Sequence, residues 1–426
     1  MRRIFTFLLA ALSTLSSIAR ACPAVLFELE TVPRLKGARK GLRLFALDAS
    51  SQKFHAVPLQ VDPLDSEGHL KFNIEPHYTD HEVDNDDFMT FRVEDFGAPA
   101  DFKKAKLPCR GRPVFELRDP SSGRVAYLTN CGSFGDPLVF PSLVDFKPEK
   151  DYLESPVYRY RFNPDNYMQF ESINFRDAVQ GTWETIAEHS ALMIHADVKN
   201  FFSMNFDAHE IESHLEAHRL GPIGDLARLS FFLKILFFKI KMSLSTDVGF
   251  YENSSHIPMM VNIPVDASKY LNPGSGILYT WILSPTAQKA PRKLAMPSMN
   301  TTLIKKGWQE LAKEGQKFCV KDVCTFRYTV EIAGKTMSMD LELERKLVAR
   351  GFFPIYVEDA RPYREPMGWN FDIGKDDLRT GMYFEVSGLS AGGHPWDFWL
   401  RLGGPATASA SCPAPLHFEE VKDSRF

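Results

Sequence analysis

The sequence lacks the short motifs that mark several classes of enzyme and metal protein. It contains no Cys-x-x-Cys pair, no Gly-x-Ser-x-Gly nucleophile elbow, and neither a Walker phosphate loop nor a Gly-x-Gly-x-x-Gly turn. These absences argue against zinc bound by paired cysteines, a serine hydrolase and a nucleotide-dependent enzyme. The chain also lacks an excess of positive charge. Its formal net charge is −4, so we expect no nucleic-acid partner.

Long apolar runs are scarce, and the clearest one is at the N-terminus. Residues 5–18 are mostly apolar, Arg2 and Arg3 precede them, and residues 19–21 (Ala-Arg-Ala) form a small-x-small cleavage site. We therefore predict a signal peptide over residues 1–21 and a protein that is periplasmic or secreted.

A second apolar run covers residues 229–240. Lys234 interrupts it, and it is shorter than the roughly 20 residues that a transmembrane helix needs. We predict core strands here, and no transmembrane segment after signal cleavage. The alternative is that residues 231–238 touch a membrane surface or a protein partner.

The chain has six cysteines, and export places them in an oxidising compartment, so we predict three disulfides. One pair flanks an expected hairpin tip, one brackets a turn-rich segment, and one joins the ends of the mature chain: Cys319 with Cys324, Cys109 with Cys131, and Cys22 with Cys412. The sequence alone leaves the connectivity open. A lipid on Cys22 is the alternative, but Ala19 and Arg20 do not match a lipidation site.

The composition is typical of a β-rich protein, with 12% aromatic residues and 28 prolines. Residues 157–162 and 337–344 alternate between the two faces of a half-buried strand. Residues 300–315 predict one short helix that begins at a capping residue and ends at Gly315. We therefore predict a mostly β fold, a large antiparallel β-sandwich or supersandwich with few short helices.

The predicted mature chain is longer than one core usually holds, so we expect two or three domains or one large sandwich. Proline, alanine and basic residues at 285–297 mark the best boundary. We predict an N-terminal β subdomain over residues 22–100, a central β-sandwich over residues 101–285, and a C-terminal β domain with one short helix over residues 298–426.

A histidine-rich segment, residues 209–218, resembles a zinc helix but has the wrong spacing. His209 and His214 are five residues apart, whereas the His-Glu-x-x-His motif needs four. The segment alternates as a strand does, which would hold His214 and His218 about 13 Å apart. We expect no metal there.

The acidic stretch near residue 84 is the better metal candidate, because several carboxylates from one loop suit calcium. The candidate ligands are Asp84, Asp86 and Asp87. No EF-hand pattern is present, and we favour a turn whose carboxylates cap its own backbone. Calcium is the one cofactor candidate.

Four short motifs carry a resemblance to known proteins. Residues 57–62 (Val-Pro-Leu-Gln-Val-Asp), 84–89 (Asp-Asn-Asp-Asp-Phe-Met), 94–97 (Glu-Asp-Phe-Gly) and 221–223 (Gly-Pro-Ile) resemble a largely uncharacterised group of secreted bacterial β-proteins. Some relatives look like carbohydrate-active proteins with a mutarotase-like β-supersandwich. The resemblance implies this fold and a carbohydrate ligand, and it identifies no catalytic residue.

Residues 392–399 are the best local candidate for carbohydrate binding, because a glycine-rich segment there carries a histidine, an acid and aromatic rings that can stack on sugars. A second polar and aromatic segment surrounds residue 361. The candidate ligand-binding residues are His394, Trp396, Asp397, Trp399, Arg361 and Tyr363. The alternative for the first group is a strand whose aromatic side chains belong partly to the core.

These observations predict an exported envelope protein that binds or processes polysaccharide. An enzyme of this kind would be a glycoside hydrolase or a polysaccharide lyase. The alternative is a non-catalytic envelope or assembly protein that contacts a protein partner or a membrane surface. A concave, acid-lined groove would favour the first function, and an exposed apolar patch would favour the second.

Overall fold

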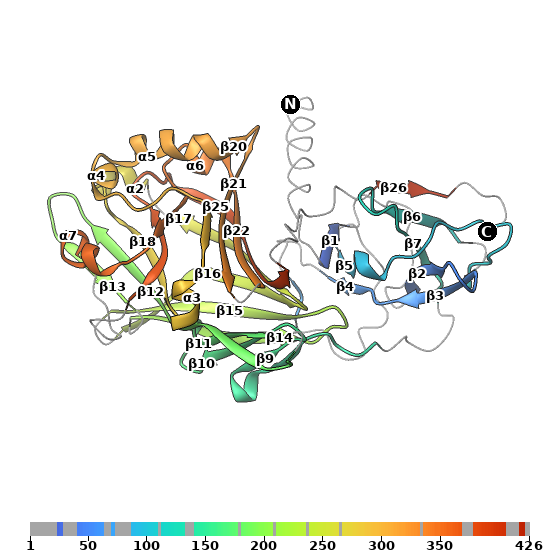
Figure 1. Ribbon diagram of the computed structural model, residues 1–426. Coiled ribbons are helices and arrows are strands. Elements are labelled where there is room, and N and C mark those ends of the chain that lie inside the picture. Colours follow the sequence, from blue (N-terminus) through green and yellow to red (C-terminus); the bar gives the residue numbers. More distant parts are fainter. Residues whose placement is uncertain are drawn as a thin grey trace, which may run out of the picture. The chain divides into compact units, whose positions relative to one another are not determined.

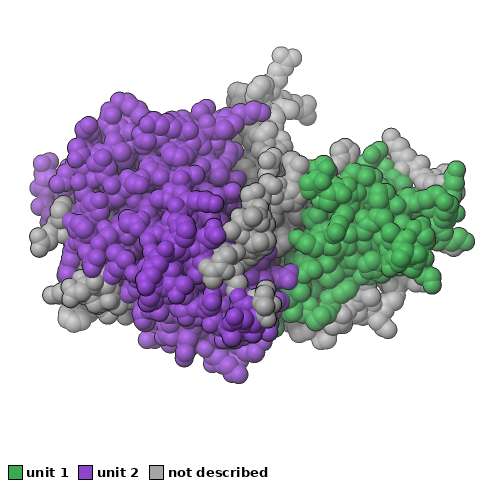
Figure 2. Space-filling view, viewed as in Figure 1, with its two compact units in different colours: residues 1–143, 219–225, 408–426 green, residues 144–218, 226–407 purple. Residues whose placement is uncertain are grey.

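The structure is a computed structural model that describes residues 24–28, 41–63, 70–72, 87–109, 112–132, 140–177, 180–207, 210–235, 238–263, 266–332, 335–368, 378–405 and 417–421. The chain forms two compact units (Figure 2). Unit 1 contains residues 1–143, 219–225 and 408–426, and unit 2 contains residues 144–218 and 226–407.

Unit 1 contains a three-stranded and a five-stranded sheet. In spatial order the strands are β1 (Ala24–Glu28), β5 (Phe88–Arg92) and β4 (Gln60–Asp62), and then β26 (His417–Glu420), β6 (Val114–Arg118), β7 (Val125–Asn130), β2 (Leu42–Asp48) and β3 (Lys53–Val57). Alternate residues of the second sheet, such as Leu44 and Leu128, pack with Met89 and Phe91 of β5. The period of two along each strand therefore builds this core.

Two large sheets build unit 2 (Figure 1). Each of them has nine strands among the described residues. We call the first of them sheet I. Its strands, in spatial order, are β23 (Pro354–Val357), β24 (Thr380–Glu385), β18 (Gly276–Leu283), β12 (Trp183–Asp197), β11 (Asn166–Arg176), β10 (Tyr158–Asn163), β9 (Tyr152–Glu154) and β8 (Asp145–Lys147), with β13 (Ser203–Phe206) paired to β12.

We call the other nine-stranded sheet of unit 2 sheet II. Its strands are β14 (Ile211–Arg219), β15 (Gly224–Ile235), β16 (Phe238–Tyr251), β17 (Ser254–Ile263), β25 (Gly392–Pro405), β22 (Lys335–Glu344), β21 (Val323–Ile332) and β19 (Arg292–Ala295), with β20 (Cys319–Val320) paired to β21. Strands from both sides of residues 285–297 contribute to each large sheet.

The predicted fold class is confirmed, because large antiparallel sheets dominate the structure. In β10 the side chains of Tyr158, Tyr160 and Phe162 are buried while Arg161 is exposed. In β22 the alternate residues from Met337 to Leu343 are likewise buried. One large apolar core joins residues of both sheets of unit 2.

The predicted single helix over residues 300–315 is two helices, α4 (Thr301–Lys305) and α5 (Trp308–Gly315). Asn300 caps α4, since its side chain accepts hydrogen bonds from the N–H groups of Thr302 and Leu303. The helix breaks at Gly307, whose φ of 95° no helix interior adopts.

The remaining helices in the described ranges are short. They are α2 (Ala267–Tyr270), α3 (Pro285–Lys289), α6 (Arg345–Val348) and α7 (Arg364–Met367), with single 3-10 turns at Val93–Asp95, Pro148–Lys150, Gln316–Phe318 and Arg361–Tyr363. Within the part of the chain that the structure describes, no helix has the length and apolar character to cross a membrane.

Two of the three predicted disulfides are present. Cys109 pairs with Cys131 at a Cα–Cα distance of 5.3 Å, and Cys319 pairs with Cys324 at 3.9 Å. The second pair closes the predicted hairpin, where β20 and β21 place the two cysteines opposite each other. The predicted third pair, Cys22 with Cys412, lies outside the described residues.

Candidate functional site

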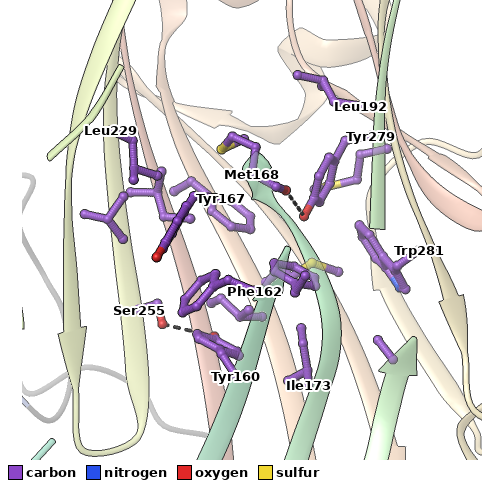
Figure 3. A pocket seen from close by; sticks show the side chains of 18 of the residues that line it. Tyr160, Phe162, Tyr167, Met168, Ile173, Leu192, Leu229, Ser255, Tyr279 and Trp281 are labelled. Atoms are coloured by element: carbon purple, nitrogen blue, oxygen red, sulfur yellow. Dashed lines mark hydrogen bonds between the residues drawn. The ribbon is translucent and has the colours of Figure 1, made fainter. Parts of the chain in front are cut away.

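An apolar cavity of about 210 Å³ lies between the two sheets of unit 2 (Figure 3). Its walls come from both sheets. The lining residues are Tyr160, Phe162, Tyr167, Met168, Phe170, Ile173, Ala187, Leu192, Ile194, Ile211, Leu229, Phe231, Val248, Phe250, Ser255, Ile257, Ile277, Tyr279, Trp281, Met337, Met339, Leu341, Met382, Phe384, Phe398 and Leu400. Among the residues that the structure describes, this wall contains no aspartate, glutamate, lysine, arginine or histidine.

The strand register explains the wall on sheet I. Leu192 of β12 pairs with Tyr279 of β18, which pairs with Met382 of β24. Two residues further along, Ile194 pairs with Ile277 in the same way. Because alternate residues share a face of a sheet, these neighbouring rows all point to the cavity side.

Sheet II supplies the opposite wall by the same rule. Ile257 of β17 pairs with Phe398 of β25, which pairs with Leu341 of β22. Leu400 lies between Ser255 and Met339 in the next row. The side chains in these rows are hydrocarbons or thioethers, with Ser255 as the exception.

The polar groups at the cavity are largely paired with each other. The hydroxyl groups of Tyr160 and Ser255 are 3.0 Å apart, and the Tyr279 hydroxyl donates to the backbone carbonyl of Met168 over 3.5 Å. Burial raises the pKa of both Tyr160 and Tyr279 above the ordinary value of a phenol. Both phenol groups therefore stay neutral, and the described lining residues offer no charge to a ligand.

Trp281 is the exception among these polar groups. It lines the cavity and is 4% exposed. Its ring N–H finds no hydrogen-bond partner among the described residues. A buried donor without a partner is unfavourable by about 1–3 kcal/mol, so an acceptor on a bound molecule would stabilise it.

The glycine-rich candidate segment is part of a central strand. Its residues lie in β25, between β17 and β22. His394 is buried, and its Nε2 lies 2.7 Å from the carbonyl oxygen of Ser390. Trp399 is 3% exposed and stacks on His256 at a centroid distance of 4.0 Å.

Two further members of this group have only their backbone described. Trp396 and Asp397 pair with Met259 and Pro258 of β17. Phe398, their neighbour, lines the cavity. Because side chains alternate along this strand, Phe398 lies in the cavity wall and Trp399 is buried on the opposite face of the sheet.

The second candidate group follows the edge strand β23 of sheet I. Arg361 and Tyr363 lie in the 3-10 turn that follows β23. Arg361 forms an ion pair with Asp359 at 2.8 Å, and Tyr363 packs against the main core. His394 and Trp399 lie in the other sheet.

The predicted calcium ligands are described only in part. Asp87 is fully buried immediately before β5, and Asp84 and Asp86 lie outside the described residues. Within the described ranges, no three His, Cys, Asp or Glu side chains gather as metal ligands would. Calcium binding stays a prediction.

A polar and aromatic cluster on the outer face of sheet I was not predicted. The Arg159 guanidinium lies 4.0 Å from the ring centroid of Trp183 and forms an ion pair with Glu154 at 2.8 Å. Tyr152 also donates a hydrogen bond to Glu154. Burial would raise the pKa of Glu154, but the hydrogen bonds from Tyr152 and Arg159 hold it below its ordinary value. Glu154 therefore stays ionised beside an aromatic surface.

Comparison with known proteins gives no sequence relative. No family model matches the chain, and no curated protein matches it. Among solved structures, an alpha-mannosidase from Enterococcus faecalis V583 aligns with a TM-score of 0.42, and a glycosyl hydrolase family 38 protein from Enterococcus faecalis with 0.41. Identity is 9% in each alignment. The alignments cover 94% of this chain but only 44% and 45% of those chains. A TM-score below 0.5 does not establish a common fold.

Proposed function

We propose that this is an exported, non-catalytic binding protein that encloses an apolar molecule in the cavity of unit 2. The observation that carries the proposal is the cavity wall, whose described residues have hydrocarbon, thioether and aromatic side chains and no charged group. An apolar pocket with few polar groups is the usual form of a small-molecule site. The sequence did not suggest this function, since its non-catalytic alternative was an envelope or assembly protein that contacts a protein partner or a membrane surface.

The volume limits the ligand. Pockets for drug-sized molecules measure roughly 300–1,000 Å³, whereas this cavity measures about 210 Å³. We therefore infer a ligand such as one segment of an acyl chain or one small ring system. Each methylene group that leaves water contributes about 0.8 kcal/mol to binding.

Fluorescence titration with 1-N-phenylnaphthylamine, a neutral dye that brightens in apolar surroundings, tests the proposal. We expect saturable binding of one dye per chain and displacement by decanol. Leu192→Trp fills the cavity from a half-buried position on β12 and should abolish dye binding. Leu294→Trp is the matched control, because Leu294 lies on β19 and is 39% exposed.

Circular dichroism and thermal unfolding show whether the Leu192→Trp protein is folded, since overpacking is unfavourable by about 1–3 kcal/mol. Equal dye binding by folded Leu192→Trp and wild-type protein would contradict the proposal. So would a wild-type titration that does not saturate.

Carbohydrate binding is the second candidate function. The polar and aromatic cluster around Trp183, on the outer face of sheet I, favours it. Sugars bind to proteins through aromatic faces flanked by hydrogen-bonding side chains. Trp183, Tyr152, Glu154 and Arg159 provide both on the outer face of sheet I. This cluster is distinct from the residues that the sequence suggested in β25 and near Arg361.

Binding of envelope and plant polysaccharides by the purified protein, together with reducing-end release, tests the second function. Trp183→Ala should weaken polysaccharide binding if the cluster is the site. Phe201→Ala replaces an exposed aromatic residue outside the cluster and is the control. The absence of both binding and release with the wild-type protein would exclude this function.

A further inference from the structure

Three exposed aromatic side chains lie at one end of unit 2. Phe201 is 80% exposed and Phe202 is 58% exposed, and both lie in the turn between β12 and β13. Tyr270, at the end of α2, is 53% exposed. The hairpin of β12 and β13 lies at an edge of the unit (Figure 1). We call these three residues the aromatic patch.

Hydrogen bonds hold the aromatic patch in place. The N–H of Val198 donates to the carbonyl of Phe202 over 3.0 Å, and the N–H of Phe201 donates back to the carbonyl of Val198 over 3.1 Å. The N–H of Lys199 donates to the carbonyl of Tyr270 over 2.8 Å, which joins the turn to α2. The exposed rings therefore stand on an ordered turn.

Basic side chains flank the aromatic patch. The Lys269 side chain is 71% exposed, and its ammonium group is 3.9 Å from Asp266. The Lys199 ammonium group donates to the carbonyl of Ser268. Two acidic residues face the same region. Asp266 caps α2 and accepts hydrogen bonds from Ser268, and Asp197 accepts from Ser203 and Asn272.

The aromatic patch is continuous with the cavity along one strand. Leu192 and Ile194 of β12 line the cavity. Val198, where the turn begins, is four residues beyond Ile194 and so about 13 Å further along the chain. The strand that lines the cavity therefore continues into the turn that carries the exposed rings of Phe201 and Phe202.

We propose that the aromatic patch is a membrane-contact site that inserts Phe201, Phe202 and Tyr270 into the headgroup region of a bilayer containing anionic lipid. Aromatic rings favour this region, and lysines beside them favour anionic headgroups. The proposal rests on the function proposed above, because contact with a bilayer would give the cavity access to apolar molecules. A projecting turn suits insertion into a surface, whereas a protein partner would need a matching pocket.

Vesicle flotation of the full mature protein tests the proposal. The vesicles contain phosphatidylcholine, alone or with about 30% phosphatidylglycerol. We expect wild-type protein to float with the anionic vesicles and less with the neutral ones. The double variant Phe201→Ser, Phe202→Ser should lose roughly tenfold or more in vesicle affinity. The replaced side chains are exposed, so the fold is retained and circular dichroism can verify it.

Val320→Ser is the matched control. Val320 is 77% exposed beside Lys321 at the tip of another hairpin, and its replacement should leave flotation unchanged. The proposal would be overturned if the Phe201→Ser, Phe202→Ser variant bound vesicles as tightly as the wild type does. It would also be overturned by wild-type protein that floats with neither type of vesicle, as expected if the aromatic patch binds a protein. Sedimentation that shows a dimer only with intact phenylalanines would assign the patch to a second copy of the chain.

Dye binding without vesicles separates this proposal from the proposed function. The double phenylalanine variant should bind 1-N-phenylnaphthylamine as the wild type does. Leu192→Trp should lose the dye and keep its affinity for vesicles. Flotation without dye binding in the wild type would leave the membrane contact standing and contradict the cavity function.

Discussion

Gln60 and Gly224 are 164 residues apart in the sequence, yet the Gln60 Oε1 accepts a hydrogen bond from the backbone N–H of Gly224 over 3.1 Å. The same oxygen accepts from the N–H of Ile223 over 3.2 Å, and Gln60 Nε2 donates to Asp62 over 3.1 Å. Asp62 in turn pairs with Arg219. The Gln-x-Asp motif of β4 therefore holds residues 219–224, which belong to the same compact unit.

Replacement of Gln60 should destabilise unit 1. Gln60 is 4% exposed, and Gln60→Ala would leave the N–H groups of Ile223 and Gly224 without their acceptor. A buried polar group without a partner is unfavourable by about 1–3 kcal/mol. Urea unfolding should show a loss of this size. Gln180→Ala, at an exposed glutamine, should change the free energy of unfolding by less than about 0.5 kcal/mol.

Gly221 should be sensitive for a related reason. A Cβ atom at this position would lie 2.1 Å from the Gln60 Oε1 and 2.7 Å from the carbonyl oxygen of Gly224. Gly221→Ala should therefore destabilise the fold. Gln60→Ala removes the nearer of the two atoms, so the double variant should lose less stability than the two single losses added together. Additive losses in urea unfolding would show that the two residues do not interact.

The sequence predicted the sheets better than the contacts between them. Alternation along β10 and β22 is local, because each strand buries every second residue whatever its neighbours are. The contact of Gln60 with residues 221–224 joins two motifs that the sequence had singled out separately. Their separation along the chain hid the contact, because nothing local to either motif requires the other.

The candidate site was harder to predict, because the cavity depends on which strands meet. For residues 392–399 the sequence left open a glycine-rich sugar-binding segment and a strand with core aromatic side chains, and pairing with β17 and β22 makes them the start of a central strand. Phe398 and Leu192 look like ordinary core residues in the sequence. The unfilled space between the two sheets becomes apparent only from the register of three strands in each sheet.

Glu385 should give the protein a pH-dependent stability. This carboxyl is buried and accepts hydrogen bonds from the Tyr383 hydroxyl over 2.7 Å and the Gly274 N–H over 3.1 Å. Burial raises its pKa from 4.5 to about 6, which these hydrogen bonds only partly oppose. Between these two pH values the folded state binds more protons than the unfolded state. The stability that Glu385 contributes therefore falls as the pH rises, by about 2 kcal/mol in total.

Thermal unfolding from pH 4 to 7 measures this contribution. Glu385→Gln cannot ionise, so its stability relative to the wild type should rise as the pH rises from about 4.5 to 6 and level off above that range. Glu171→Gln, at an exposed carboxyl on sheet I, is the control and should run parallel to the wild type. Parallel curves for Glu385→Gln and the wild type would contradict the assignment.

Trp281 should select for ligands that carry a hydrogen-bond acceptor. Trp281→Phe keeps an aromatic ring in the cavity wall and removes the N–H that has no partner among the described side chains and backbone. Affinity for methyl decanoate should fall by roughly 2–10-fold, the value of one hydrogen bond. Affinity for decane, which has no acceptor, should hardly change. Competition against 1-N-phenylnaphthylamine measures both, and equal losses for the two ligands would show a packing effect alone.

Anomalous diffraction from crystals grown with 1-bromodecane locates the ligand and so tests binding in the cavity itself. We expect one bromine peak between the two sheets of unit 2, near Leu192, Ile257 and Phe398, and no such peak in crystals of Leu192→Trp. A cavity without bromine in crystals that hold the ligand elsewhere would contradict the proposed function.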